Sequence, residues 1–513
     1  MNLLYTDENS EKSVNVLSDE TYLNLAIDEI ISMIAVTTDE KNLLKKIFTN
    51  VPNDYETANY RQEILKDFMH DEDLCLELSE VLKSLDVLKE YRDNVRFTIE
   101  KKSSLYELIN YITEMEVYIK IIEDLNILFA KHAVRSRGLI TVRELLKEVI
   151  AADKITELKE IVSSLKAETS TLKSVTVGIN LTPELRPEEI KILFFNTAKY
   201  PSQFDKKAFG ASIQSGYEVR YREPSQFMKY IADDMEKELS KNVQRHKKKL
   251  REYVNLKGYF LLDICNDLRV YLMLAKFGRK LQSSNFTITF PKVCEVCDKV
   301  VMKEIYNVRL TKNTDAEIVT NDFTFSKDEN IFILTGPNRG GKTMLTQALG
   351  INALFASLGF FVMASSYEGF LFSEILTHFP ADENLTLDLG RLGEEATRVQ
   401  KIVKKADRRT LVLLNETYSS TSSSDGLYLA MDLVHILKYK GVPTVFNTHI
   451  LDLARNCKKM NEWEGDSNVI SITMEMKDNV NTYRVLRSEP DGTSFARNIA
   501  LKYGVTYEQL LDS

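Results

Sequence analysis

The stretch NIFILTGPNRGGKT, residues 330–343, decides the fold of the C-terminal part of the chain. Residues 331–334 form a short apolar run, and the pattern G-x4-G-K-T follows directly, which is the spacing of a phosphate-binding loop between a strand and a helix. Glycine lets successive backbone N–H groups turn toward an anion. The helix expected over residues 344–358 points its positive end at the same place. The stretch therefore predicts a nucleotide site.

Each part of this loop has an expected role toward a nucleotide. The Lys342 side chain reaches the β- and γ-phosphates, and the Thr343 hydroxyl ligates Mg²⁺. ATP or GTP is the expected ligand. A chance glycine-rich turn is disfavoured because the whole pattern is present with both flanks. The residues expected to surround the nucleotide are Gly336, Pro337, Asn338, Arg339, Gly340, Gly341, Lys342, Thr343 and Met344.

Composition indicates an ordinary protein of several domains. The 513 residues are 44% hydrophobic and 28% charged, so two to four domains are expected. The net charge of −8 argues against a basic coat for nucleic acid, so any DNA contact must be local. Apolar runs are too short to span a bilayer and the N-terminus lacks the layout of a signal peptide. We therefore expect a cytoplasmic protein without membrane contact.

The five cysteines do not suggest a disulfide framework, because their number is odd and they are scattered. A reducing compartment fits this usage. Cys294 and Cys297 have the spacing of half a zinc site, but no second pair follows. Buried structural cysteines are therefore expected rather than a metal or redox centre.

The chain divides into three expected regions. Residues 1–150 read as a helical core domain, since apolar residues recur every three or four positions from residue 21 onward. Residues 151–284 read as a long-helix lever with a small β module at 174–223. Residues 285–513 read as an α/β P-loop domain. The strands expected in the β module are 174–181, 191–195 and 217–221.

Two helices are expected to form the lever. Residues 155–172 carry one apolar stripe that needs a partner helix, and residues 227–281 supply a candidate. The second helix contains a basic run that either contacts phosphates or forms a solvated face, and the sequence leaves both open. The candidate nucleic-acid contacts in this run are Lys241, Arg245, Lys247, Lys248, Lys249 and Arg251.

Strands alternate with helices in the C-terminal region, which predicts a parallel sheet. The expected strands are 286–290, 331–334, 410–414, 444–447, 469–476 and 482–486.

Polar residues follow two of these strands. Asn415 and Glu416 come directly after residues 410–414, where a P-loop protein normally has an acidic pair. We expect Glu416 to be the general base, whereas Asn415, in place of the usual Asp, holds Mg²⁺ through water. His449 follows the strand that ends at residue 447 and is expected to respond to the γ-phosphate. Lys342, Glu416 and His449 are thus the candidate catalytic residues.

Three motifs carry a family resemblance. TGPNRGGKT at 335–343, LLNETYSSTSSSDG at 413–426 and NTHILDL at 447–453 resemble the Walker A, Walker B and histidine-switch segments of the MutS family. Upstream, residues 58–68 and 175–181 are similar to pieces of the family's helical core and lever. The resemblance implies an ABC-type ATPase that works as a dimer on DNA, with ATP held between one protomer's Walker motifs and the other's signature segment.

The chain departs from the family pattern at three places. The segment Gly390-Arg391-Leu392-Gly393-Glu394-Glu395 lacks the signature serine, Arg339 replaces a Met, and Asn415 replaces an Asp. The 513 residues also leave no room for the mismatch-reading N-terminal domains. We therefore expect a divergent, truncated MutS-related protein.

The leading hypothesis is a homodimer that binds and hydrolyses ATP with Mg²⁺ and gates a helical clamp on DNA. The alternative is a nucleotide-gated scaffold that binds ATP with little hydrolysis and recruits a protein partner, which Asn415 and the missing serine favour. A P-loop kinase for a small acceptor is disfavoured because nothing after the P-loop resembles an acceptor lid.

Overall fold

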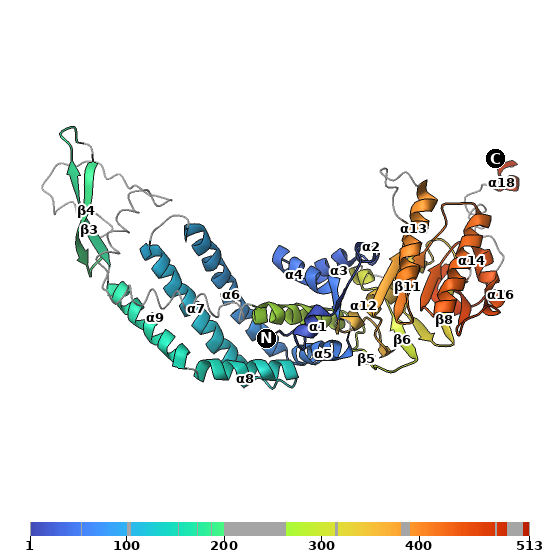
Figure 1. Cartoon of the computed structure of the whole chain (residues 1–513), viewed down its shortest axis with the longest axis horizontal. Coiled ribbons are helices and arrows are strands. Elements are labelled where there is room, and N and C mark those ends of the chain that lie inside the picture. The colour runs from blue at the N-terminus through green and yellow to red at the C-terminus, as the bar shows by residue number, and fades with distance from the viewer. Residues whose placement is uncertain are drawn as a thin grey trace. The chain divides into compact units, whose positions relative to one another are not determined.

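Two compact units make up the chain, residues 71–269 and residues 2–70 with 270–513. Figure 1 shows their elements, which are described here unit by unit. The computed structural model describes residues 2–52, 54–99, 104–151, 153–171, 173–185, 187–199, 263–312, 317–380, 390–477, 480–489 and 506–511.

Four long helices dominate the unit of residues 71–269. They are α6 (Glu72–Ile99), α7 (Ser104–Lys131), α8 (Arg137–Ala151) and α9 (Asp153–Thr171), and α7 contacts each of the other three. Helices α6 and α7 have 28 residues each, or about 42 Å at 1.5 Å per residue. The helices predicted up to residue 150 and over 155–172 are confirmed.

The apolar stripe of α9 is buried, as its spacing predicts. Leu158 and Leu165 are 1% and 0% exposed. The stripe lies against α7, and two ion pairs flank the contact: Lys159 with Glu123, and Lys166 with Glu116, each at 2.6 Å. The second lever helix, expected over residues 227–281, lies outside the described residues except for 263–281, which are helical.

A two-stranded antiparallel ribbon follows α9. Strands β3 (Ser174–Leu181) and β4 (Pro187–Asn196) pair from Ser174 with Asn196 to Leu181 with Pro187. Both predicted strands are confirmed, and β4 is longer than expected. The third strand of the expected module, residues 217–221, lies outside the described residues.

A six-stranded sheet forms the centre of the second unit, in the order β10-β11-β12-β8-β13-β14. Its first five strands are parallel and β14 is antiparallel to β13. Five predicted strands are thereby confirmed. The bounds are β8 (Glu329–Thr335), β10 (Glu374–His378), β11 (Thr410–Asn415), β12 (Thr444–Asn447), β13 (Asn468–Lys477) and β14 (Val480–Arg487).

The strand predicted over residues 286–290 was wrong. Only Thr289 pairs, with Val362, through an isolated antiparallel bridge. Asn285 before the run has a positive φ of 63°, and Pro291 after it has no N–H to continue a ladder. The aromatic residues of this run therefore pack as a loop, Phe290 edge-on against Phe361 at 6.5 Å.

A second sheet, ordered β5-β9-β6-β7, packs beside the first and was not predicted. Phe323 and Phe325 of β7 contact Phe332 of β8, with ring centroids 4.6 and 5.6 Å apart. These aromatic contacts join the two sheets. The bounds are β5 (Lys292–Val293), β6 (Lys299–Ile305), β7 (Asn321–Ser326) and β9 (Ser366–Gly369).

Helices cover both faces of the central sheet. Helix α12 (Lys342–Ser357) is buried along nearly its whole length, and a Cβ added at Gly350 would lie 2.7 Å from Leu25 and from Leu413. Helices α13 (Gly390–Lys405) and α14 (Ser423–Lys440) cover the other face, where Val399 and Val434 belong to one apolar cluster with residues of the sheet. The P-loop helix is thus enclosed between the sheet and the N-terminal residues.

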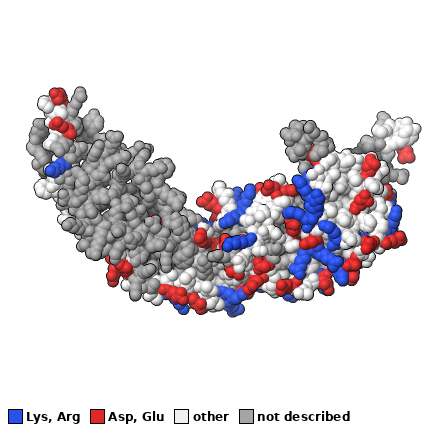
Figure 2. All heavy atoms as spheres, viewed as in Figure 1, with Lys and Arg blue, Asp and Glu red and all other residues white. Residues whose placement is uncertain are grey.

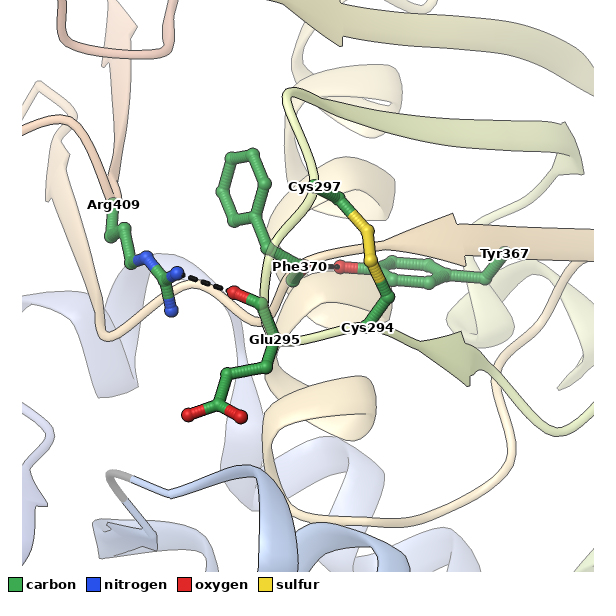
Figure 3. The surroundings of a disulfide bond; sticks show 6 residues. All are labelled: Cys294, Glu295, Cys297, Tyr367, Phe370 and Arg409. Atoms are coloured by element: carbon green, nitrogen blue, oxygen red, sulfur yellow. Dashed lines mark hydrogen bonds between the residues drawn. A yellow bond between two sulfur atoms is a disulfide. The ribbon is translucent and has the colours of Figure 1, made fainter.

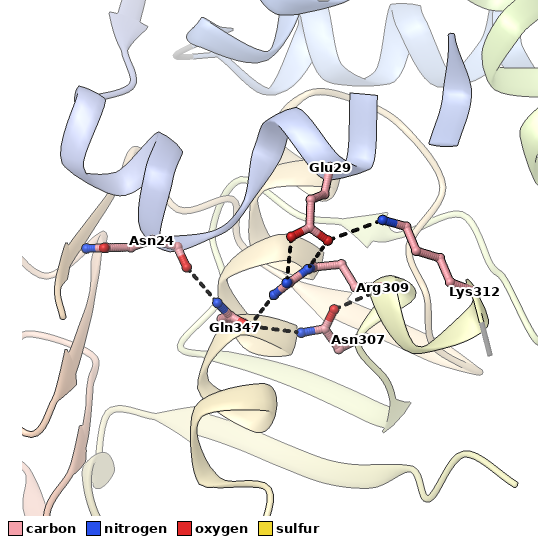
Figure 4. Close-up of polar contacts among 6 residues, drawn as sticks. All are labelled: Asn24, Glu29, Asn307, Arg309, Lys312 and Gln347. Atoms are coloured by element: carbon pink, nitrogen blue, oxygen red, sulfur yellow. Dashed lines mark hydrogen bonds and ion pairs between the residues drawn. The ribbon is translucent and has the colours of Figure 1, made fainter. Parts of the chain in front are cut away.

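Residues 2–70 belong to the unit that holds the P-loop. This grouping differs from the expected helical domain of residues 1–150. The contacts that hold them there are polar as well as apolar. Gln347 of α12 donates to the Asn24 carbonyl at 2.8 Å, and Arg309 pairs with Glu29 through two bonds of 2.9 and 3.0 Å (Figure 4). Periodicity alone does not show which sheet an amphipathic helix covers.

The remaining elements are short. Strands β1 and β2 pair antiparallel. No helix within the described ranges is long and apolar enough to cross a bilayer. The bounds are α1 (Glu8–Lys12), β1 (Val14–Val16), α2 (Asp19–Asn24), α3 (Ile27–Ile34), α4 (Thr38–Thr49), β2 (Asn50–Pro52), α5 (Tyr55–His70), η1 (Val308–Lys312), α15 (Leu451–Arg455), α16 (Cys457–Asn461) and α18 (Tyr507–Leu511).

Candidate functional site

Three neighbouring parallel strands end at the same edge of the central sheet. Asn415 at the end of β11 is in register with Asn447 of β12, which is in register with Leu334 of β8. The glycine-rich loop, Glu416 and His449 follow these strand ends directly. The structure therefore brings together the residues that the sequence separates by more than a hundred positions.

The loop after β8 has the backbone conformation that its glycines allow. Gly336 and Gly341 have φ of 136° and 91°, a region that side chains with a Cβ rarely adopt. A Cβ at Gly336 would also lie 2.8 Å from the Cβ of Met474. Arg339, where the family has Met, adopts φ of 62°, and its carbonyl accepts a 3.2 Å bond from Asn481 of β14. The β13–β14 hairpin thus holds the loop from one side.

Lys342 is buried at the start of α12, with 6% of its surface exposed. Its Nζ donates to the carbonyls of Gly336 and Pro337 at 3.0 and 3.1 Å. Burial lowers the pKa of Lys342, and the nearby Glu416 carboxylate partly opposes this. A buried cation held only by neutral carbonyls gains most from an incoming anion.

Asn415 lies at the centre of a small group of oxygen and amide atoms. Its Oδ1 accepts a 3.3 Å bond from the Thr343 hydroxyl and a bond from Nδ2 of Asn447. The buried Oδ1 of Asn447 has no hydrogen-bond partner among the described residues. Sequence reasoning missed Asn447, although its place at a strand end beside Asn415 was available as a signal.

The adjacent oxygens of Thr343 and Asn415 fit a Mg²⁺ site. Hydroxyl and amide oxygens are hard ligands of the kind Mg²⁺ prefers, and Mg²⁺ normally takes its other ligands from phosphates and water. Both donors are neutral, so the protein supplies no charge from these two positions. Within the described part of the chain, no group of three or more His, Cys, Asp or Glu residues is arranged to hold a metal.

Glu416 and His449 form a hydrogen-bonded pair, with Oε1 and Nε2 2.8 Å apart. Glu416 has a left-handed backbone with φ of 54°, and its N–H donates to the Asn447 carbonyl at 2.8 Å. This conformation turns the Glu416 side chain out of the sheet at the strand end. Both side chains are partly exposed, at 34% and 43%. They are therefore accessible to water, as a general base must be.

A cavity of about 500 Å³ lies against the loop. The predicted residues that line it include Lys342, Thr343 and Glu416. Its far wall was not foreseen: it contains Tyr306, Asn307, Leu310, Met474 and Tyr483. These residues come from β13, β14, η1 and the two residues between β6 and η1, and no motif marked them.

Two contacts support the loop that follows Glu416. His378 at the end of β10 is fully buried, and its Nδ1 lies 2.8 Å from the hydroxyl of Thr417. Burial, followed by the charge of Arg398, lowers the pKa of His378 to about 4. Ser420 donates to Glu395 at 2.6 Å. Glu395 belongs to the segment that lacks the family's signature serine, and it is bonded within its own chain.

The remaining expected site residues divide into two groups. The basic run from Lys241 to Arg251 lies outside the described residues. Cys294 and Cys297, expected as buried structural thiols, are instead half-buried and joined by a disulfide. Their Cα atoms are 6.0 Å apart, a distance within the range that a disulfide can bridge. The short spacing that suggested half a zinc site also permits this bond.

An α/β fold with a glycine-rich loop at the carboxyl edge of a parallel sheet is the class that this geometry defines. Comparison with known families agrees. The chain matches the MutS2 N-terminal domain over residues 53–283 and MutS domain V over residues 332–508. MutS domain V is the P-loop ATPase domain of that family. The chain is a divergent MutS-related protein.

Individual relatives match parts of the chain. The protein named Endonuclease MutS2 of Halothermothrix orenii is 25% identical over 279 residues, which are 54% of this chain and 32% of that protein. Endonuclease MutS2 of Clostridium tetani is 27% identical over 277 residues, 52% of this chain and 34% of that protein. DNA mismatch repair protein msh-2 of Neurospora crassa is 32% identical over 157 residues, which are 30% of this chain and 17% of that protein. The matched region thus spans about one third or less of these relatives.

Proposed function

We propose that this protein binds ATP at the glycine-rich loop and hydrolyses it, and that nucleotide state controls its grip on DNA. One observation carries the proposal: Lys342, Thr343, Asn415, Glu416 and His449 meet at the carboxyl edge of three adjacent parallel strands. Ligands of open α/β sheets bind at this edge. The cavity of about 500 Å³ beside the loop is in the range of small-molecule sites.

The bonds of Lys342 indicate how the site receives a phosphate. In the structure its ammonium group is held by the carbonyls of Gly336 and Pro337. Phosphate oxygens form stronger, charge-assisted bonds than these neutral acceptors. We infer that Lys342 exchanges the two carbonyls for the β- and γ-phosphates while the backbone N–H groups of the loop surround the β-phosphate. This exchange also removes the cost of keeping a buried cation without a counter-ion.

Glu416 and His449 provide the proton chemistry of hydrolysis. Glu416 accepts the proton of the attacking water, and the bond to His449 fixes the orientation of its carboxylate. The other carboxylate oxygen is left to contact water. We infer that His449 also reports the presence of the γ-phosphate, because it lies at the end of the strand next to the loop.

The Thr343 hydroxyl and the Asn415 amide are the groups that would hold Mg²⁺. When bound, the ion neutralises charge on the phosphates. Asn447 supports this pair, because its Nδ2 donates to Asn415 and fixes the orientation of the amide.

DNA binding and dimerisation are the parts of the proposal that rest on relatives. One relative is named as a mismatch repair protein and two as endonucleases, and the matched domains are those of the MutS family. In the face shown in Figure 2, basic and acidic side chains are interspersed over the coloured surface. We therefore place the DNA contact at a local site, with the run from Lys241 to Arg251 as the candidate.

A scaffold that binds ATP with little hydrolysis is the second candidate, and two observations favour it. Asn415 removes one negative charge from the expected metal site. Glu395 does not substitute for the missing serine, because it is buried and bonded to Ser420 of the same chain. A chain of this kind would use nucleotide binding to recruit a protein partner.

The substitution Glu416→Ala distinguishes the two candidates. It should leave ATP affinity within about twofold and reduce hydrolysis by roughly a hundredfold or more, which is the effect of losing a general base. Binding is measured by titration with labelled ATP, and turnover by phosphate release. Glu464→Ala, which changes an exposed carboxylate before β13, outside the strand ends and the signature segment, is the matched control. Equal turnover in wild type and Glu416→Ala would leave the scaffold as the better description.

A further inference from the structure

We propose that Cys294 and Cys297 form a reversible redox couple that exchanges with small anionic thiols of the glutathione type, and that Cys297 is the sulfur attacked. The proposal does not depend on the ATPase function. The two cysteines lie on the turn between β5 and β6 (Figure 3). This turn is remote in sequence from every strand-end residue of the nucleotide site.

The turn is held in place without the disulfide. On one side β5 pairs with β9, and the N–H of Cys294 donates to the Gly369 carbonyl at 3.0 Å. On the other side β6 pairs with β7 and β9. Arg409 adds a bond of 2.7 Å to the carbonyl of Glu295 between the two cysteines (Figure 3).

This anchoring makes the bond reversible. A disulfide that closes so short a loop constrains little of the unfolded chain, so the fold does not depend on it. After reduction the sheet keeps both thiols close to each other, and a neighbouring thiol re-forms the bond readily. The bond is therefore suited to repeated opening and closing rather than to structural support.

Exposure separates this pair from the other cysteines. Cys294 and Cys297 are half-buried, whereas Cys75, Cys265 and Cys457 are 1%, 0% and 8% exposed. Burial raises the pKa of the Cys457 thiol to about 12, which suppresses its thiolate. Thiol chemistry is thus directed to the pair on the turn.

A cavity of about 200 Å³ gives one of the two sulfurs an approach. It is lined by Cys297 and not by Cys294, and its basic side chains are Lys327, Arg408 and Arg409. Two carboxylates also line it, Asp298 and Asp466, of which Asp466 pairs with Arg408 at 3.3 Å. The lining therefore carries an excess of one positive charge, which favours an anionic partner.

A buried polar atom of a residue that lines this cavity also has no hydrogen-bond partner among the described residues. Asn330 is 6% exposed, and its Nδ2 donates to the Gly441 carbonyl at 2.9 Å. Its Oδ1 has no hydrogen-bond partner within the described part of the chain, and Asn330 lines the cavity with Cys297. An ammonium or amide group of a glutathione-type ligand would satisfy this acceptor.

Reduction of the pair takes two steps of thiol–disulfide exchange. The thiolate of one small thiol attacks Sγ of Cys297, the disulfide breaks, and Cys294 leaves as a thiolate that takes a proton from water. A second small thiol attacks the mixed disulfide, which releases Cys297 and forms the oxidised small molecule. Two electrons pass from two small thiols to the protein, and the reverse sequence re-forms the Cys294–Cys297 bond.

Thiol counting on the full chain tests reversibility. Native wild-type protein is treated with reduced glutathione and then oxidised glutathione, and maleimide-reactive thiols are counted by intact mass at each stage. We expect two additional reactive thiols after reduction and their loss after oxidation. Two thiols that persist in oxidised glutathione, or a stoichiometric zinc ion bound to the reduced pair, would overturn the proposal.

Single-cysteine variants test which sulfur is attacked. In Cys294→Ser, oxidised glutathione should form a mixed disulfide at Cys297 about tenfold faster than it does at Cys294 in Cys297→Ser, because only Cys297 lines the cavity. Circular dichroism verifies that both variants are folded. If one of them is not, thiol counting on the wild-type protein remains the test of the redox couple. Equal rates in the two folded variants contradict the assignment of Cys297.

Changing the charge of the cavity tests the class of thiol. Arg408→Gln should slow reduction by glutathione several-fold relative to reduction by cysteamine, whose ammonium group gains nothing from a positive lining. Lys292→Gln is the matched control, because Lys292 is an exposed cation next to the turn that does not line the cavity. The same ratio of rates in Arg408→Gln and Lys292→Gln would refute selection by charge.

Discussion

Asn415 is the residue at which this chain departs most consequentially from its family. Its Oδ1 accepts bonds from Thr343 and Asn447, so the amide is already oriented as a metal-holding oxygen would be. An aspartate at this position could accept the same two bonds, because both partners are donors. The replacement therefore changes charge while it preserves the hydrogen-bond pattern.

Asn415→Asp should lower the Mg²⁺ concentration needed for half-maximal ATPase activity. A carboxylate holds a hard divalent ion more tightly than an amide does, by roughly tenfold for a change near the metal. Repulsion from Glu416 opposes this when the ion is absent, but the divalent charge outweighs it when the ion is bound. Mg²⁺ titrations of both proteins measure the effect. An unchanged or higher requirement would show that residue 415 does not address the metal.

At the level of single residues, the sequence predicted most of the side chains that lie together at the strand ends, whose roles stay predictions. The lysine, threonine, asparagine, glutamate and histidine at the strand ends were all identifiable because each follows a recognisable apolar run. Tyr483 and Asn307 were not, since each reaches the cavity through pairing or packing between distant segments. The disulfide was also missed, because cysteine spacing alone does not distinguish a bonded pair from half a metal site.

His378 at the end of β10 contacts the loop that follows β11. Its ring is fully buried and bonded to Thr417, one residue beyond Glu416. Burial and Arg398 lower the pKa of His378 from 6.5 to about 4. Between these two pH values the ring is mostly neutral in the folded protein and mostly protonated in the unfolded chain. Its stabilising effect is therefore complete above about pH 6.5 and is lost as pH falls toward 4.

His378→Gln should flatten this pH dependence. Between about pH 7 and pH 4, protonation linked to His378 should lower the unfolding free energy of the wild type by about 3 kcal/mol. A glutamine does not titrate, so the variant should not show this part of the loss. Urea unfolding at both pH values measures the difference. His435→Gln is the control, because that ring is exposed and lies outside the site. The same loss of stability in wild type and His378→Gln would contradict this account.

At the level of elements, periodicity predicted the helices and four of the five parallel strands, but it missed β10 and the second sheet. Strands β6 and β7 carry partly alternating burial, yet Phe323 and Phe325 of β7 are recognisable as sheet residues only once they contact Phe332 of β8. The run at 286–290 has strand-like composition, but among the described residues it pairs only through Thr289. Pairing is a property of two segments, so one segment's pattern does not determine it.

At the scale of the whole molecule, residues 2–70 pack with the P-loop region although they precede the long helices in sequence. The bond from Gln347 to Asn24 and the Glu29–Arg309 pair connect these residues to α12 and to the segment beside the cavity. Asn307, which lines the cavity, donates to Gln347 in the same network (Figure 4). The domain division expected from the sequence could not include this contact, because chain order does not indicate which separated segments share a core.

The proposed DNA binding concerns the whole chain, and the basic run provides its test. Replacing Lys247, Lys248 and Lys249 together with Glu should weaken duplex binding and reduce its salt dependence by about 0.9 in log–log slope for each phosphate that the variant no longer neutralises. The slope is measured by fluorescence anisotropy over a series of salt concentrations. Replacement of Lys41, Lys45 and Lys46 of α4 with Glu is the matched control. An unaltered slope would identify the run as a solvated helix face.

The central claim is that the loop after β8 binds ATP through Lys342, and Lys342→Ala tests it most directly. The change removes the side-chain cation that the structure places against the loop carbonyls, and with it the charge-assisted bonds to the terminal phosphates. Isothermal titration with ATP and Mg²⁺ should show binding to wild type and a loss of affinity of at least about a hundredfold in the variant. Equal affinity in the two proteins would contradict the assignment of this loop as the nucleotide site.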